Sequence, residues 1–156
     1  MGNNPLYSSP ICKQTSPSRG NGYSEHANVK RAWGEWLRQW RWDWWVTLTF
    51  RYPVSTRQAH RLWKEWIHLL EHSVQSKVHY VRVTEYQRFR GDIPHFHALL
   101  LGVREQQPKR WEGTWNNLGG LAKVEPYDVK LGATHYLAKY LINGTGDIIL
   151  GVGNQL

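Results

Sequence analysis

Two stretches of the chain carry apolar residues at three- and four-residue steps, the spacing that places side chains on one face of a helix. The first stripe consists of Val29, Ala32, Trp33, Trp36, Leu37 and Trp40. The second consists of Ala59, Leu62, Trp63, Trp66, Ile67 and Leu70, preceded by Ser55 as a capping residue. The pattern predicts two amphipathic helices whose tryptophans pack into a core.

Other stretches alternate apolar and polar residues, the period-two pattern of β-strands. Residues 44–50 form the first predicted strand, with Thr47 and Thr49 on the face opposite to its apolar residues. Residues 78–86 and 95–103 form two more strands. A short polar segment joins these two, which predicts an antiparallel hairpin.

The last third of the chain predicts further elements of both kinds. We expect a helix around Trp111 and Trp115, a short strand over 121–126 and a final helix over 131–142. The strand ends at a proline, which is typical of a sheet edge, and residues 148–150 can add a terminal strand. Helices mixed with a hairpin indicate an α+β fold with an antiparallel sheet.

Length and composition favour one folded domain with a tail. The 156 residues are 40% hydrophobic, which suffices for one core. Residues 1–25 lack any apolar period and contain three prolines, so we expect a flexible tail there and a domain over 26–156.

The charge balance narrows the class of partner. The formal net charge is +8, which favours polyanions, with nucleic acid ahead of an acidic membrane surface. The single cysteine, Cys12, excludes an internal disulfide and favours a reducing, intracellular compartment. No apolar run approaches the ~20 residues that span a bilayer, so we expect no membrane partner.

The strongest chemical signal is Pro94-His95-Phe96-His97. In a strand, His95 and His97 project from the same face, where two imidazoles can chelate a divalent cation. The alternative is a pair of hydrogen-bonded histidines at the sheet surface. If Gly91 lies near the middle of the hairpin loop, Glu85 falls opposite His97 on the same face, and the three side chains suit Mg²⁺ or Mn²⁺.

Two alternatives to Glu85 as the third ligand stay open. Asp92 is a competing carboxylate, although a loop position is harder to preorganise. Glu85 itself can instead serve as an ion-pair partner for Arg82 or Lys123.

A second signal lies in the predicted last helix. Tyr136 and Tyr140 stand four residues apart, so both phenols face one way, with Lys139 beside them. A phenol is a possible covalent nucleophile, and a neighbouring ammonium favours the phenolate. The alternative is an ordinary amphipathic helix whose tyrosines pack on the sheet.

Together these motifs resemble the HUH (histidine-hydrophobic-histidine) endonuclease superfamily of rolling-circle replication initiators. The likeness covers roughly residues 42–142. Residues 45–50 resemble its first motif, Glu85 to His97 its metal motif, and Tyr136-x-x-Lys139-Tyr140 its tyrosine motif.

The resemblance implies a five-stranded antiparallel sheet with the histidines on a central strand and the tyrosine helix over them. It also implies a metal-dependent nick in single-stranded DNA at a replication origin, leaving a 5′-phosphotyrosine and a free 3′-hydroxyl. Tyr136 takes the role of nucleophile, and Tyr140 is either a second nucleophile or a packing residue. The residues expected to contact DNA are Arg82, Arg88, Arg90 and Lys123, together with Thr47 and Thr49.

The partners expected from this interpretation are DNA and host replication proteins. The sequence has no phosphate-binding loop of the NTPase type, so we expect a host helicase and polymerase, and no small-molecule cofactor. The expected location is the cytoplasm of a prokaryotic host, with a plasmid or small single-stranded DNA virus as the replicon. Rival interpretations are an HUH transposase or relaxase, and a non-catalytic module that binds single-stranded nucleic acid.

Overall fold

A computed structural model describes residues 22–87, 93–132, 137 and 148–151. The elements are α1 (Gly22–Arg38), β1 (Trp44–Phe50), α2 (Thr56–Val74), β2 (His79–Gln87), β3 (Ile93–Leu101), α3 (Pro108–Leu118), β4 (Gly120–Pro126), η2 (Val129–Leu131) and β5 (Ile148–Gly151). The strands form one five-stranded sheet in the order β4-β1-β3-β2-β5, with every neighbouring pair antiparallel. This confirms the predicted α+β class, with β4 at an edge and β3 in the centre.

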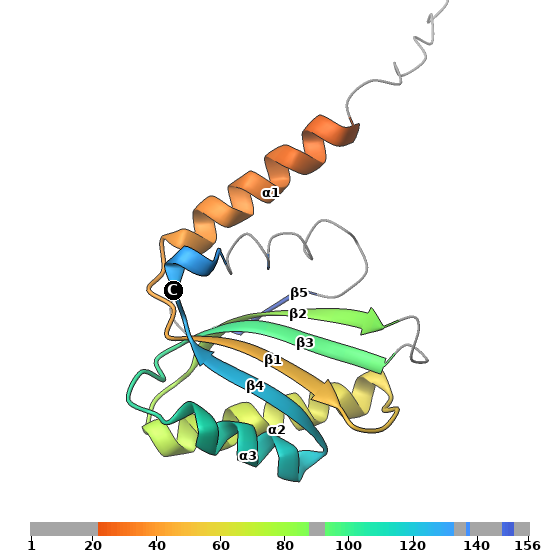
Figure 1. Cartoon of the computed structure of the whole chain (residues 1–156), viewed down its shortest axis with the longest axis vertical. Helices are drawn as coiled ribbons and strands as arrows, with labels where there is room; N and C mark the ends of the chain where they lie inside the picture. Colours follow the sequence, from red (N-terminus) through yellow and green to blue (C-terminus); the bar gives the residue numbers. More distant parts are fainter. Residues whose placement is uncertain (1–21, 88–92, 133–136, 138–147, 152–156) are drawn as a thin grey trace, which may run out of the picture.

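One face of the sheet is covered by α2 and α3, which lie side by side beneath it (Figure 1). The predicted stripe of α2 is buried throughout, and the Ser55 side chain accepts a hydrogen bond from the Gln58 N–H at the start of the helix. The main core forms here, where Trp63 and Trp66 meet the apolar residues that β1 and β3 direct downward. Amphipathic helices and an alternating sheet thus bury their apolar faces against each other.

The opposite face of the sheet carries a smaller apolar cluster. It consists of Leu37, Trp42, Val81, Val83, Leu99 and Leu137, with half-buried residues around them. Only the end of α1 reaches this cluster, because the helix projects away from the sheet (Figure 1). The prediction for α1 was therefore wrong in part: Leu37 is buried, Trp33 and Trp36 are half-buried, and Val29 is exposed.

Some predicted boundaries also differ. The helix α1 begins at Gly22, inside the segment expected to be a flexible tail, and residues 1–21 lie outside the described residues. The predicted final helix over 131–142 also falls mostly outside them, although Leu137 is helical. In the part of the chain that the structure describes, no helix has the length and apolar character needed to cross a membrane.

Candidate functional site

The central strand β3 separates its side chains between the two faces of the sheet. Phe96, Ala98 and Leu100 are fully buried on the helix-covered side. His95 and His97 therefore point to the other side, where their ring centroids lie 5.3 Å apart. This confirms that the two imidazoles share one face of a central strand.

Glu85 of β2 belongs to the same face. Its Oε2 lies 3.3 Å from Nε2 of His97. The predicted register was wrong, because Glu85 pairs with His95 and reaches His97 diagonally. Gln87 pairs with Ile93, so the pairing of β2 with β3 is centred on position 90 rather than on Gly91.

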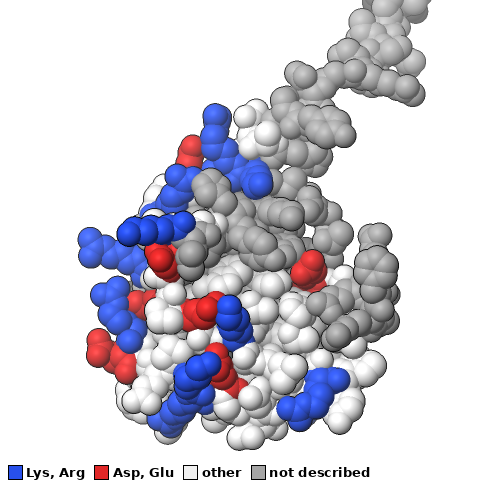
Figure 2. All heavy atoms as spheres, viewed as in Figure 1, with Lys and Arg blue, Asp and Glu red and all other residues white. Residues whose placement is uncertain are grey.

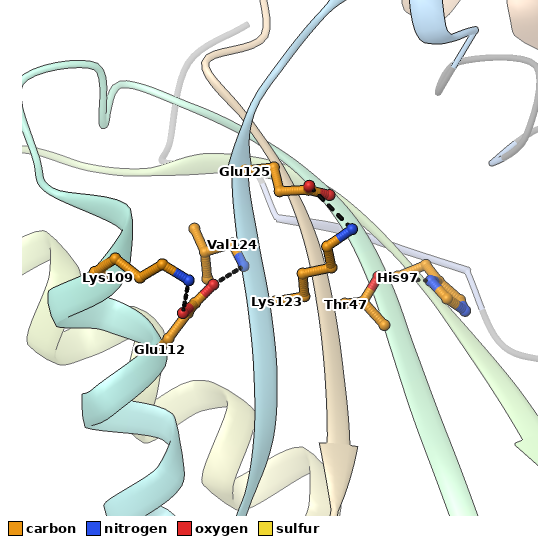
Figure 3. A network of polar contacts seen from close by, with 7 residues as sticks. All are labelled: Thr47, His97, Lys109, Glu112, Lys123, Val124 and Glu125. Carbon is orange, nitrogen blue, oxygen red and sulfur yellow. Dashed lines mark hydrogen bonds and ion pairs between the residues drawn. The ribbon is translucent and has the colours of Figure 1, made fainter.

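Two threonines of β1 hold the imidazoles from the other side. Thr47 Oγ1 lies 3.3 Å from Nδ1 of His97, as Figure 3 shows, and Thr49 Oγ1 lies 3.2 Å from Nε2 of His95. Both contacts follow from the β1–β3 register, which pairs Thr47 with His97 and Thr49 with His95. The threonines expected to contact DNA thus contact the histidines.

The surroundings of His97 keep its ring neutral. Burial lowers the pKa of His97, and the nearby His95 lowers it further, although the hydrogen bond and charge of Glu85 act in the opposite direction. Neutral imidazole is the form that can bind a metal. When its one proton is on Nδ1 and donated to Thr47, the Nε2 lone pair faces the Glu85 carboxylate.

The side chains fit a divalent cation in part. The 3.3 Å between His97 Nε2 and Glu85 Oε2 is close to the ~3 Å that separates adjacent ligands of an octahedral ion with bonds of about 2.1 Å. Among the described residues, however, no three His, Cys, Asp or Glu side chains are arranged to hold an ion as they stand. Nε2 of His95 lies 3.2 Å from the Thr49 hydroxyl and is not part of such a group.

Sequence reasoning missed an aromatic cover over this site. The Trp45 ring stacks on the His97 ring, with centroids 5.8 Å apart and an interplanar angle of 15°. The alternation of side chains along β1 places Trp45 on the same face as Thr47, so the sequence could have predicted that the indole lies near the histidines. The indole limits the directions in which the imidazole can turn.

Lys123 of β4 lies in the same row across the sheet. It pairs in register with Thr47, which in turn pairs with His97 (Figure 3). Its ammonium is exposed and lies 3.0 Å from a carboxylate oxygen of Glu125, not beside Glu85. A cation thus stands at the margin of the histidine site.

Arg82 does not belong to this face, and its expected contact with DNA was wrong. Its side chain is 1% exposed and points to the helix-covered side. The guanidinium lies 4.2 Å from the Phe96 ring centroid and 5.1 Å from that of Trp63, and Nη2 donates to Nε2 of His60. A cation placed in this way supports packing rather than recognition.

The remaining predicted site residues cannot be placed. Arg88, Arg90 and Asp92 lie outside the described residues, as do Tyr136, Lys139 and Tyr140. Leu137, the chain neighbour of Tyr136, is described and fully buried in the cluster that contains Val83 and Leu99. That cluster lies on the same face as His97.

Comparison with known proteins identifies the family. No curated protein and no solved structure matches the chain. The sequence model of a family described as replication-associated protein ORF2/G2P matches residues 43–145 of the 156. This range starts just before β1 and contains every residue of the histidine site as well as the two tyrosines. The chain therefore belongs to the replication-associated protein ORF2/G2P family, and its role lies in DNA replication.

Proposed function

We propose that the chain is a metal-dependent nickase and strand transferase of the HUH type, which initiates rolling-circle replication of a plasmid or a small single-stranded DNA virus. One observation carries the proposal. On a central strand of a protein from a replication-associated family, an imidazole faces a carboxylate at 3.3 Å, with a second imidazole beside it. This donor set suits a hard divalent cation.

The metal ligands in this proposal are His97, Glu85 and His95, and the ion is Mg²⁺ or Mn²⁺. When bound, the ion polarises the scissile phosphate and neutralises the charge that develops on it. Thr47 holds Nδ1 of His97, so that Nε2 stays directed toward Glu85 and would be free to bind the ion. Glu85 supplies a carboxylate oxygen next to that nitrogen.

The nucleophile is the phenol of Tyr136. Its oxygen attacks the scissile phosphorus and loses its proton to solvent, while the bond from phosphorus to the 3′-oxygen breaks and that oxygen takes a proton from water. The products are a 5′-phosphotyrosine and a free 3′-hydroxyl. The ammonium of Lys139 favours the phenolate, and Tyr140 is a second nucleophile or a packing residue.

Leu137 supports this assignment of the nucleophile. Leu137, the residue that follows Tyr136 in the chain, is buried in the cluster on the histidine side of the sheet. This burial is what the proposal requires of the chain next to the nucleophile.

The phosphotyrosine bond keeps the energy of the broken phosphodiester. A later 3′-hydroxyl can reverse the reaction and rejoin the strand without ATP. The partners in this proposal are single-stranded origin DNA and a host helicase and polymerase, in the cytoplasm of a prokaryotic cell. A transposase or relaxase uses the same chemistry on other DNA, and the identity of the captured sequences distinguishes these roles.

The test is covalent capture of single-stranded oligonucleotides of random sequence with Mn²⁺. Because the proposed bond is to the 5′-phosphate, a 3′-labelled oligonucleotide should become attached on a denaturing gel. A 5′-labelled oligonucleotide should instead give a shorter free fragment. Sequencing the attached DNA then gives the nick site.

Two variants at matched positions separate catalysis from binding. We expect Tyr136→Phe to abolish the adduct with little change in DNA affinity, and Tyr140→Phe to retain it. His97→Ala and chelation by EDTA should also prevent adduct formation. If wild-type protein never forms an adduct and Tyr136→Phe weakens binding, the protein is a binding module whose tyrosines stack on bases.

A further inference from the structure

The solvent face of α2 is lined with basic residues. While one face of this helix packs on the sheet, residues at steps of three and four on the opposite face are all exposed. They are Arg57, Arg61, Lys64, His68 and His72, defined here as the α2 stripe. At 100° per residue they occupy a sector of about 80°, and at 1.5 Å per residue they extend over about 22 Å.

The three permanent cations of the α2 stripe lack acidic partners among the residues that the structure describes. Within the described ranges, Arg57, Arg61 and Lys64 form no ion pair, although Glu65 is exposed at the margin of the stripe. Some other exposed cations, such as Arg31 and Lys109, instead lie next to carboxylates, and blue and red are mixed on the surface around α1 and α3 (Figure 2). Positive charge on the α2 stripe is therefore available to an external anion.

The α2 stripe is separate from the histidine site. The helix lies under the sheet (Figure 1). His95 and His97 point to the other side, because Phe96 and Ala98 between and beyond them are buried against the helices. The α2 stripe also offers no exposed Trp, Tyr or Phe ring, because Trp63 and Trp66 are 1% and 0% exposed. Single-strand binders combine cations with aromatic side chains that stack on bases, so the stripe does not resemble a single-strand site.

We propose that the α2 stripe binds the phosphate backbone of duplex DNA, independently of sequence. The duplex presents rows of phosphates with a dense negative charge, which exposed Lys and Arg neutralise with release of counterions. This function goes beyond strand cleavage, since it places duplex DNA on one side of the sheet and the proposed single-stranded substrate on the other. Duplex next to the nick site can then stay bound during cleavage.

The test is fluorescence anisotropy with a labelled 20-base-pair duplex of random sequence, titrated over a range of salt concentrations. We expect Arg57→Gln/Arg61→Gln/Lys64→Gln to weaken binding at least tenfold. The slope of log affinity against log salt should shrink by about 2.7, or 0.9 per phosphate contact for three contacts. Each single substitution should reduce the slope by about one.

The matched control removes three cations that already have carboxylate partners. Lys77, Arg104 and Lys109 are 69%, 68% and 87% exposed, and Lys77→Gln/Arg104→Gln/Lys109→Gln changes the net charge equally. It should retain the wild-type salt slope. Equal losses in both triple variants would show an effect of net charge alone and overturn the proposal.

Three further measurements complete the test. Thermal melting by circular dichroism should confirm that both variants fold. Adduct formation with single-stranded oligonucleotides should be unchanged in the α2 variant, which separates this proposal from the nickase proposal. Unchanged duplex affinity, a loss confined to single-stranded DNA, or binding only to anionic vesicles would each refute the duplex site.

Discussion

The hydroxyl of Thr47 offers the sharpest test of the histidine site. Thr47→Val keeps the β-branched shape that suits a strand but removes Oγ1, which lies 3.3 Å from Nδ1 of His97. Without this partner the ring no longer has a fixed proton position, and Nε2 is no longer held toward Glu85. We expect weaker Mn²⁺ binding in a protein that still folds.

The size of the effect follows from one hydrogen bond. Its net free energy is about 0.5–1.5 kcal/mol, and loss of a residue that orients a ligand lowers metal affinity about 10- to 100-fold. A tenfold loss of metal affinity, which corresponds to about 1.4 kcal/mol, lies within both ranges. Isothermal titration of metal-free protein with Mn²⁺ measures this change, and a melting curve without metal monitors the fold.

Thr49→Val is the matched control for the same experiment. Its hydroxyl lies 3.2 Å from Nε2 of His95 rather than beside His97, the imidazole that faces Glu85. Removing it leaves the contact between Thr47 and His97 in place, so the loss of Mn²⁺ affinity should be smaller than in Thr47→Val. If Thr49→Val loses as much affinity as Thr47→Val, or if neither changes it, Thr47 does not orient His97 for metal binding.

Three further predictions concern stability. Arg82→Ala should lower the free energy of unfolding by about 3 kcal/mol in urea, because it leaves a cavity beside Phe96; a change under 1 kcal/mol would contradict its role in the core. Asp43→Ala should lower the free energy of unfolding by about 2–3 kcal/mol, because the carboxylate accepts hydrogen bonds from the backbone N–H groups of residues 102 and 103 and from Arg104 Nε. Asp43→Asn should lower it less. Burial on its own raises the pKa of Glu112, but hydrogen bonds from Lys109 and the Val124 N–H outweigh it and lower that pKa below the ordinary 4.5. As the pH falls, the carboxylate is therefore protonated in the unfolded chain before it is protonated in the folded protein. The stability that Glu112 contributes is present above pH 4.5 and is lost as the pH falls through the lowered pKa of the folded state. Glu112→Gln should flatten the pH dependence of urea unfolding below pH 4.5, and an unchanged slope would refute this.

The sequence predicts best where an element has one apolar face and one polar face. The alternation in β1 and the stripe of α2 each give the correct face, because each element packs one side into the main core. For α1 the same pattern predicts too much burial, because its apolar residues continue beyond the end of the helix that reaches the sheet. Periodicity shows that a face is apolar, not which neighbour covers it.

Two features of the site could not be predicted reliably from the sequence: the burial of the charged residue Arg82 and the register of the β2–β3 hairpin. Arg82 alternates with Val81 and Val83, so its side chain faces the helices, and a charged residue on a strand covered on both faces is buried. The register of the hairpin depends on how many residues its loop contains, and Gly91 does not fix that number. A shift of one residue in the loop centre moves the partner of Glu85 by two positions, from His97 to His95.

The precision of the histidine site originates in the residues between and beyond the histidines. Phe96, Ala98 and Leu100 are each 0% exposed, so packing against the helices fixes the β3 backbone. The period of two then sets the face of the sheet from which His95 and His97 project. Neighbouring strands need only supply a hydroxyl on one side and a carboxylate on the other, from positions that the sheet register sets. Side chains held in this way lose little conformational freedom on binding an ion, which a site built on loops cannot achieve as readily.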